Sequence, residues 1–218
     1  MEIQASLLTL NLPKSALVAV RSSSTLEDLK NMAGAGLFDS ILNVPLSDIA
    51  NVRKAIVNVW LSLFTERAII SRKQYGITSE QAHMSVLIQQ QIHSDFSFVI
   101  HTRNPVNQNP NEVYIEVAVG LGETLASANQ SGTPYRLIYR RDADECEVMA
   151  FANYSYGLFA TINGTEPDNQ IIDYSKIQFS TEVEQLELLG KRLGRVSLEI
   201  ERELGGSPQD IEGAVVIE

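Results

Sequence analysis

The chain has 218 residues, of which 44% are apolar, and its formal net charge is −10. This length suits one large globular domain or two small subdomains, and no run of about 18 apolar residues is present that would predict a membrane span. The acidic balance argues against binding along nucleic acid, and the single cysteine, Cys146, excludes an internal disulfide.

The first expected element is a short strand over Leu17–Val20 that leads directly into Arg21 and three serines. A guanidinium and serine hydroxyls are donors suited to phosphate oxygens, and the glycines within Ala33–Gly36 let a backbone come close to a ligand. The segment from Val18 to Val44 therefore has the chemistry of an anion-binding cradle. The alternative is a strand, a serine-containing turn and a helix start, with Arg21 in a surface ion pair.

A long helix is expected after Pro45, because Ser47 or Asp48 can cap its first turn and Gly76 can end it. Apolar residues recur along it at helical spacing, so they are expected to form its buried face, with Trp60 in the core. These residues are Val52, Ile56, Val59, Trp60, Leu63 and Ile70.

The middle of the chain is expected to be rich in strands. Alternation over Glu112–Val119 predicts a strand with one apolar face, and the following Gly120–Thr124 turn leads into a short helix. Pro134–Arg140 and Cys146–Ala152 are expected to pair as a hairpin, and residues 153–179 to be irregular. The other expected strands are Met84–Ile92 and Phe96–Thr102, and the polar loop that follows them is Asn104–Asn111.

A second long helix is expected over about residues 181–204, where Thr181 and Glu184 have the spacing of a capping box. Its apolar stripe is expected to be buried, and the two glycines that follow are expected to end it. The stripe consists of Leu186, Leu189, Leu193, Val196, Ile200 and Leu204. A strand over Ala214–Ile217 is expected after the helix.

Two acidic residues near the end of the sequence, Asp210 and Glu212, stand two positions apart where that strand is entered. Their side chains are therefore expected on one face of the strand. Two carboxylates on one face repel each other unless a cation lies between them, and a hard divalent metal suits oxygen ligands. An exposed acidic strand end without a metal is the alternative.

Polar residues elsewhere are candidates for ligand contacts. Gln89–Gln91 lies in an otherwise apolar strand, where an inward-facing amide must be satisfied by a ligand or by a neighbouring strand. Glu123 follows the glycine-rich turn at an expected helix start, where it can meet a ribose hydroxyl or cap the helix. His83, His93 and His101 are expected to be structural, because none has metal-ligand spacing with the cysteine.

Several short motifs together resemble the nucleotide-binding domain shared by pyruvate phosphate dikinase, phosphoenolpyruvate synthase and the glucan, water dikinases. They are Val20–Ser23, Glu27–Leu29, Ala35-Gly36, Asn43-Val44 and Gln209–Gly213. Six stretches resemble the phosphoglucan, water dikinases most: Phe98–Thr102, Val119–Ser127, Gly132–Pro134, Phe151–Asn153, Asp173–Lys176 and Gly205–Gly213. The resemblance covers about residues 17–217.

The resemblance implies an α+β fold of the ATP-grasp type, with two lobes, mixed or antiparallel sheets and two long helices, that holds ATP and Mg²⁺. Residues 1–16 are then a connector or a truncated start, and residues 17–218 form a nucleotide-binding domain of one or two subdomains, truncated at both ends. The implied enzyme is a dikinase, incomplete as this chain alone. ATP passes its β-phosphate to a histidine on a separate domain of the same or a neighbouring polypeptide and its γ-phosphate to water. The phosphohistidine then phosphorylates a glucan such as starch.

Motif position implies that Arg21 holds the phosphates as the catalytic residue and that Glu212 binds Mg²⁺ with Asp210 nearby. The expected ATP contacts, from the resemblance and the residue chemistry together, are Arg21, Gly36, Ser40, Gln89, Glu123 and Glu212.

Two alternatives stay open. The first is a pyruvate phosphate dikinase or phosphoenolpyruvate synthase type of domain. The second is a non-catalytic nucleotide-binding fragment, because members of the family carry an early glycine-rich segment with a phosphate-binding lysine, which has no counterpart in residues 1–16. Glucan is expected only as an indirect partner, and no nucleic acid or membrane is expected. The compartment stays open between plastid and cytoplasm.

Overall fold

The computed structural model describes residues 7, 11–26, 36–126, 131–161 and 167–217. It divides into two compact units, which are described separately: residues 1–92 with 160–168, and residues 93–159 with 169–218. Each unit contains helices and antiparallel strands, which confirms the predicted α+β class.

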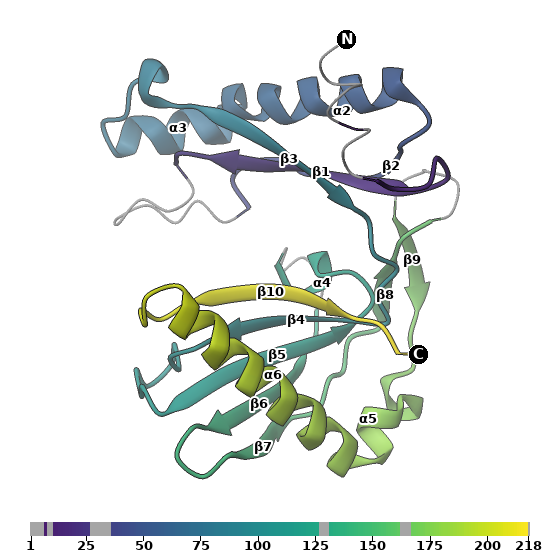
Figure 1. Ribbon diagram of the computed structural model, residues 1–218, viewed down its shortest axis with the longest axis vertical. Coiled ribbons are helices and arrows are strands. Elements are labelled where there is room, and N and C mark those ends of the chain that lie inside the picture. Colours follow the sequence, from purple (N-terminus) through teal and green to yellow (C-terminus); the bar gives the residue numbers. More distant parts are fainter. Residues whose placement is uncertain (1–6, 8–10, 27–35, 127–130, 162–166, 218) are drawn as a thin grey trace. The chain divides into compact units, whose positions relative to one another are not determined.

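Unit 1 is built on a three-stranded antiparallel sheet in the order β2-β1-β3, with one face covered by helix α2 (Figure 1). Its strands and helices are β1 (Leu17–Ser24), β2 (Ile41–Pro45), α2 (Ile49–Leu61), η1 (Ser62–Phe64), α3 (Glu66–Gln74), η2 (Ser79–Gln81) and β3 (Met84–Gln90). The core between sheet and helix contains Val18, Val20, Val52 and Val59, all fully buried. Burial of such aliphatic side chains is the main stabilising term of a fold of this kind.

Strand β1 runs four residues beyond the expected end at Val20. Arg21 to Ser24 pair in register with Leu87 to Met84 of β3, so the serines lie in a strand and not in a turn. The pairing partner stands about sixty residues further along the chain, which is why local composition did not reveal it. The acidic pair Glu27-Asp28 and most of the Ala33–Gly36 stretch lie outside the described residues.

The prediction of one continuous long helix after Pro45 is wrong, because two helices separated by a short 3-10 turn are found in its place. Helix α2 ends at Leu61, a 3-10 turn follows, and α3 begins at Glu66 with Thr65 as its cap; the Thr65 hydroxyl accepts a hydrogen bond from the Ala68 amide at 3.3 Å. The buried Arg72 guanidinium donates to the carbonyl of Leu63, which the interruption leaves without a helical partner. Gly76, at φ 67°, follows the end of α3, as predicted.

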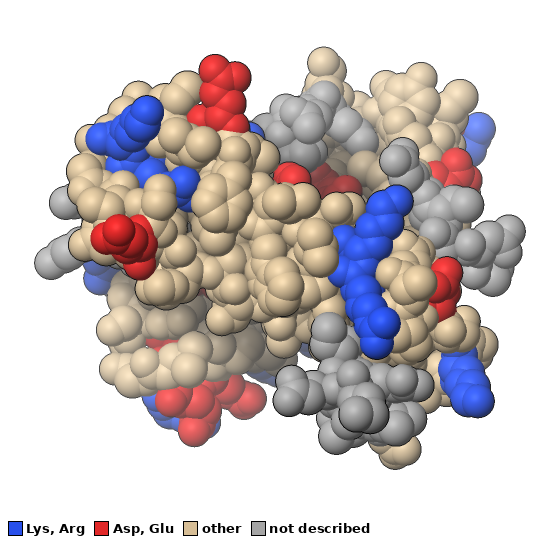
Figure 2. Space-filling model, turned by 90° about the horizontal axis from the view of Figure 1, so that it is seen from above, with Lys and Arg blue, Asp and Glu red and all other residues tan. Residues whose placement is uncertain are grey.

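Trp60 is 46% exposed, and Ile70 is also exposed, so the prediction that they belong to the core is wrong. The buried stripe of α2 consists of Val52, Ala55, Ile56 and Val59, and Trp60 lies at its edge. The interruption after Leu61 then rotates the following residues, which takes Ile70 away from the stripe. Figure 2 views the molecule from above and shows a wide uncharged region with basic and acidic side chains around it.

The cap of α2 provides the first test of the fold. The carboxylate of Asp48 accepts a hydrogen bond from the Asn51 amide at 3.0 Å, which confirms one of the two predicted caps. Because Asp48→Ala leaves this amide without its partner, we expect a loss of about 1 kcal/mol in the free energy of unfolding. Denaturant titration measures it. Ser47→Ala, one residue earlier and equally exposed, is the control, and an equal loss in both variants would contradict the assignment.

Unit 2 is built on a five-stranded antiparallel sheet in the order β10-β4-β5-β6-β7, and helix α6 packs on one of its faces (Figure 1). The elements are β4 (Phe96–His101), β5 (Glu112–Val119), α4 (Glu123–Ala126), β6 (Tyr135–Arg140), β7 (Glu145–Ala150), β8 (Tyr156–Phe159), β9 (Asp168–Ile171), η3 (Tyr174–Lys176), α5 (Gln178–Thr181), α6 (Val183–Glu203) and β10 (Asp210–Val215). The hairpin of β6 and β7 and the short helix α4 confirm the predictions for these segments. None of the described helices is long and apolar enough to cross a membrane.

The central strand β5 has the predicted bounds. Val113, Ile115 and Val117 are fully buried on the α6 side, while Glu112 and Glu116 lie on the other face. Residues 153–179 are less irregular than expected, since β8 and β9 pair as a small sheet and Leu158 forms a bridge with Gly120.

Helix α6 starts and packs differently from the prediction. The capping box at Thr181 is wrong, because Thr181 ends α5 and its hydroxyl donates to the Gln178 carbonyl at 3.1 Å. Val196 is 52% exposed and Leu204 is exposed, whereas two glycines face the sheet. The glycines are Gly190 and Gly194, where an added Cβ would lie 2.4 Å from the Cys146 sulfur and from the Tyr139 ring respectively. The helix therefore packs closely on the sheet through its two glycines. A prediction based on the spacing of apolar side chains does not include glycines in the buried face.

Candidate functional site

In unit 1, two of the predicted site residues come together on adjacent strands. Arg21 pairs with Leu87, and Ala19 pairs with Gln89, so Arg21 and Gln89 project from the same face of the sheet. This is the face opposite α2. On the other side of β1, the pairing with β2 ends at Val20 and Ile41, and Ser40 directly precedes β2 without pairing to β1. Arg21 is partly buried, whereas Ser40 and Gln89 are exposed.

Gly36 lies four residues before Ser40, at φ 67°, a backbone conformation that favours glycine. An added Cβ would meet no atom within 4 Å, so the backbone here is open to an approaching group. Leu37 and Phe38, which follow it, are buried against Leu63 and Ala68 and hold this end of the segment in place.

Of the glutamines in and after β3, Gln91 is the buried one, and it lies just past the strand. Its amide nitrogen donates to the Ile92 carbonyl at 3.4 Å, while its amide oxygen is buried without a hydrogen-bond partner. The inward-facing amide expected from the sequence is therefore Gln91, and Gln89 is the one that faces outward beside Arg21.

In unit 2, Asp210 and Glu212 lie on one face of the edge strand β10, as their spacing predicts. Ile211, between them, turns to the other face and packs on the core. Asp210 is 81% exposed, and its carboxylate oxygen Oδ1 lies 2.6 Å from Nδ1 of His101, its partner across the pairing of β10 with β4. Sequence reasoning missed this contact because the two residues are 109 positions apart.

The same face of the sheet continues as a row of charged and aromatic side chains. The Arg136 guanidinium donates to the carboxylate of Glu116 at 2.9 Å, and the Tyr114 hydroxyl donates to the same oxygen at 3.0 Å. Burial, and then the neighbouring Glu116 charge, raises the pKa of Tyr114 to about 12, so this phenol keeps its proton. Glu116 is therefore held by two donors.

Glu123 is not brought close to Asp210. It is the first residue of the four-residue helix α4 and is exposed there. An added Cβ on the preceding Gly122 would be 3.8 Å from Ser97, near the start of β4, whereas Asp210 pairs with His101 at its end. Four residues of strand span roughly 13 Å. A single ligand that contacts both residues would need that reach.

The described part of the chain contains no group of three His, Cys, Asp or Glu side chains that would hold a metal ion without further ligands. Asp210 and Glu212 nevertheless fit Mg²⁺, because this ion takes one or two carboxylates together with substrate phosphates and keeps several waters. Such a site is complete only when the phosphates are present.

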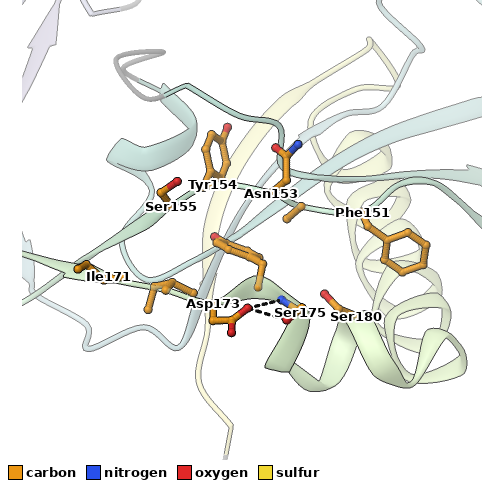
Figure 3. Close-up of a pocket in the computed structure, with 11 residues that line it drawn as sticks. Phe151, Asn153, Tyr154, Ser155, Ile171, Asp173, Ser175 and Ser180 are labelled. Atoms are coloured by element: carbon orange, nitrogen blue, oxygen red, sulfur yellow. Dashed lines mark hydrogen bonds between the residues drawn. The ribbon is translucent and has the colours of Figure 1, made fainter.

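A pocket on unit 2 is lined by none of the seven predicted residues (Figure 3). Asn153, Tyr154 and Ser155 line it from one segment, and Asp173 and Ser175 from another. The Asp173 carboxylate accepts hydrogen bonds from the Ser175 hydroxyl at 2.6 Å and from its amide at 3.2 Å, which lower the pKa of Asp173. The Asp173 carboxylate in this pocket therefore already has hydrogen-bond donors from its own loop.

Comparison with known proteins gives a consistent result. The family model described as "Pyruvate phosphate dikinase, AMP/ATP-binding domain" matches residues 2–216. A rifampicin phosphotransferase of Bacillus cereus is 35% identical over 199 residues, which is 91% of this chain and 22% of that protein. A chloroplastic alpha-glucan water dikinase of Solanum tuberosum is 32% identical over 186 residues, 74% of this chain and 13% of that protein.

An archaeal protein named probable phosphoenolpyruvate synthase, from Archaeoglobus fulgidus, is 32% identical over 206 residues, 93% of this chain and 25% of that protein. The chain thus spans a quarter or less of the length of these relatives.

Proposed function

The chain belongs to the family of pyruvate phosphate dikinase AMP/ATP-binding domains, and from this premise we propose that it is the ATP-binding part of a glucan, water dikinase. In this proposal the β-phosphate of ATP passes to a histidine on another domain and from there to a glucan, while the γ-phosphate passes to water and AMP leaves. The observation that carries the ATP site is the position of Arg21 and Gln89 on one sheet face.

The chemistry of that group suits a polyphosphate. The planar guanidinium of Arg21 offers paired donors to phosphate oxygens, and we assign the Ser40 hydroxyl as a further donor. The Gln89 amide can both donate and accept, which suits a nucleotide contact. The open backbone at Gly36 lets a phosphate approach without meeting a side chain.

Asp210 and Glu212 of unit 2 are the residues that we assign to Mg²⁺. In a chain of net charge −10, a divalent cation offsets the repulsion between carboxylates and triphosphate. When bound, Mg²⁺ neutralises charge that develops on the phosphates during transfer. Glu212 holds the cation, Asp210 lies beside it, and Glu123 remains a candidate for the ribose.

The glucan acceptor is supported by the stretches Val119–Ser127 and Asp173–Lys176, which resemble glucan-type dikinases, and by the alpha-glucan water dikinase among the relatives. The experiment is an acceptor assay with the full-length protein. AMP released with a glucan but not with pyruvate supports the proposal, and pyruvate-dependent release overturns it.

The ATP site is tested by comparing Arg21→Ala with Arg53→Ala. Arg21 is partly buried in the central strand of its sheet, whereas Arg53 is exposed on α2. Loss of a charge-assisted contact costs roughly 1.5–3 kcal/mol, so we expect Mg-ATP affinity to fall by about one to two orders of magnitude in Arg21→Ala alone. Isothermal titration calorimetry measures both affinities. Equal affinities in the two variants would overturn the role of Arg21.

A further inference from the structure

An ion pair ties the β6–β7 hairpin to helix α6. Arg141, in the hairpin turn, donates through both of its terminal nitrogens to the Glu201 carboxylate, at 2.9 and 2.8 Å. The two side chains are only 24% and 13% exposed. A two-pronged arginine–carboxylate contact with this burial fixes both side chains in one geometry.

The same guanidinium also donates to the backbone carbonyl of Thr102, directly after β4. Thr102 is fully buried and holds Gln209 twice: its amide donates to the Gln209 carbonyl at 2.9 Å, and its hydroxyl accepts from the Gln209 amide at 2.8 Å. Gln209 directly precedes Asp210. A continuous chain of contacts therefore leads from Arg141 to the start of β10.

Glu201 also takes part in the end of α6. Its backbone carbonyl accepts from the Gly206 amide at 2.8 Å, and Gly205 donates to the Arg202 carbonyl at 3.2 Å. Both glycines have positive φ, and this pair of bonds is the Schellman ending of a helix. The chain then reverses and reaches Gln209 within three residues, so Glu201 fixes the approach to β10 from the other side.

We propose that Arg141 and Glu201 are positioning residues that hold the start of β10, and with it the Asp210 and Glu212 carboxylates, in place for Mg-ATP. This inference rests on the proposed function of the two carboxylates. Outer contacts of this kind orient metal-binding carboxylates without touching the ligand. In line with a charged pair in the resting protein, the Arg141 contact lowers the pKa of Glu201.

The hairpin does not depend on Arg141 alone for its attachment to α6. Asp144, in the same turn, lies 3.0 Å from the Lys191 ammonium and accepts from Nε of Arg195 at 2.8 Å. Removal of Arg141 therefore leaves the hairpin anchored. Its sequence neighbour Arg140 forms an exposed pair with Glu147 of β7, at 2.9 Å, on the edge of the sheet opposite β10, so Arg140→Met is a matched control.

The test compares wild type with Arg141→Met, Arg141→Lys and Arg140→Met. Arg141→Lys keeps the positive charge but lacks the planar guanidinium. It is the milder variant, to be used if Arg141→Met impairs folding. ATP affinity is measured with Mg²⁺ and with EDTA, and amide hydrogen exchange is followed over residues 209–215. A general structural defect would lower the ATP affinity equally with Mg²⁺ and with EDTA. Displacement of the two carboxylates would instead reduce the difference between these two affinities, which is the Mg²⁺-dependent gain.

We expect Arg141→Met to reduce the Mg²⁺-dependent gain in ATP affinity about tenfold, to reduce protection in 209–215, and Arg140→Met to do neither. If wild type binds Mg-ATP and Arg141→Met keeps the full gain, the inference is overturned and the proposed function stands. If wild type does not bind Mg-ATP, the proposed function fails, and the role of Arg141 in placing carboxylates for Mg-ATP fails with it, whatever hydrogen exchange shows over residues 209–215.

Discussion

Gly120→Ala is expected to destabilise the protein more than any other single exchange proposed for it. Gly120 has φ 80°, and a Cβ there would lie 2.1 Å from the backbone carbonyl oxygen of Leu158. That oxygen already accepts a hydrogen bond from the Leu121 amide at 2.7 Å, so it is not free to move. Left-handed backbone and overpacking together cost roughly 2–5 kcal/mol.

Denaturant titration of wild type, Gly120→Ala and Gly205→Ala separates these two terms. Gly205 has φ 92° in the same unit, but an added Cβ would meet nothing within 4 Å. We expect Gly205→Ala to lose only about 1 kcal/mol, the cost of the backbone conformation alone. A loss in Gly120→Ala no larger than that of the control would show that the β5–β8 contact adjusts to the methyl group.

Gly120 also illustrates how far the sequence predicts the fold. A glycine-rich turn into a short helix was expected here and is present, and the end of strand β5 at Val119 was right because the strand alternates cleanly and the turn residues are local signals. What the turn packs against was not predictable, because Leu158 belongs to a segment that carries no such pattern. The hairpin of β6 and β7 was predictable for the same local reasons.

The helices show the limit of counting apolar residues. Val196 fits the 3.6-residue period of α6 and yet is exposed, because Gly190 and Gly194 face Cys146 and Tyr139 and draw the helix to the sheet along another line. Trp60 is exposed because it lies at the edge of the buried stripe of α2. In both helices the size of the side chains that pack against the helix decides which face is buried. Which side chains these are depends on tertiary contacts between distant parts of the chain.

For the candidate site, the residue types were predictable from the sequence, but the residues that lie next to them in the structure were not. Phosphate chemistry pointed to Arg21, but only the register of β1 with β3 sets Gln89 on the same face of the sheet. The two-residue spacing of Asp210 and Glu212 was enough to place both on one strand face. The contact of Asp210 with His101 depends on strand pairing between distant parts of the chain.

Glu212→Gln is expected to remove most of the Mg²⁺ dependence of ATP binding. In β10, Glu212 lies opposite Val99, so its cross-strand neighbour in β4 supplies no second carboxylate to replace it. Loss of a direct carboxylate ligand should cost at least as much as loss of an outer contact, so we expect Mg-ATP affinity to fall about a hundredfold. Without nucleotide the change in stability should stay within about 1 kcal/mol, since the side chain is exposed.

The melting temperatures of wild type, Glu212→Gln and Glu145→Gln, with and without Mg-ATP, test this expectation. Glu145 is an exposed carboxylate on β7, the opposite edge strand of the same sheet, so its loss changes net charge equally. Ligand raises the melting temperature by mass action, and we expect the rise to persist in Glu145→Gln and nearly to vanish in Glu212→Gln. An equal rise in all three proteins would mean that Glu212 is only an acid at a strand edge and that the cation is held elsewhere. A reduced rise in both variants would instead assign the effect to net charge, because a local metal ligand cannot be replaced by a carboxylate at the far edge of the sheet.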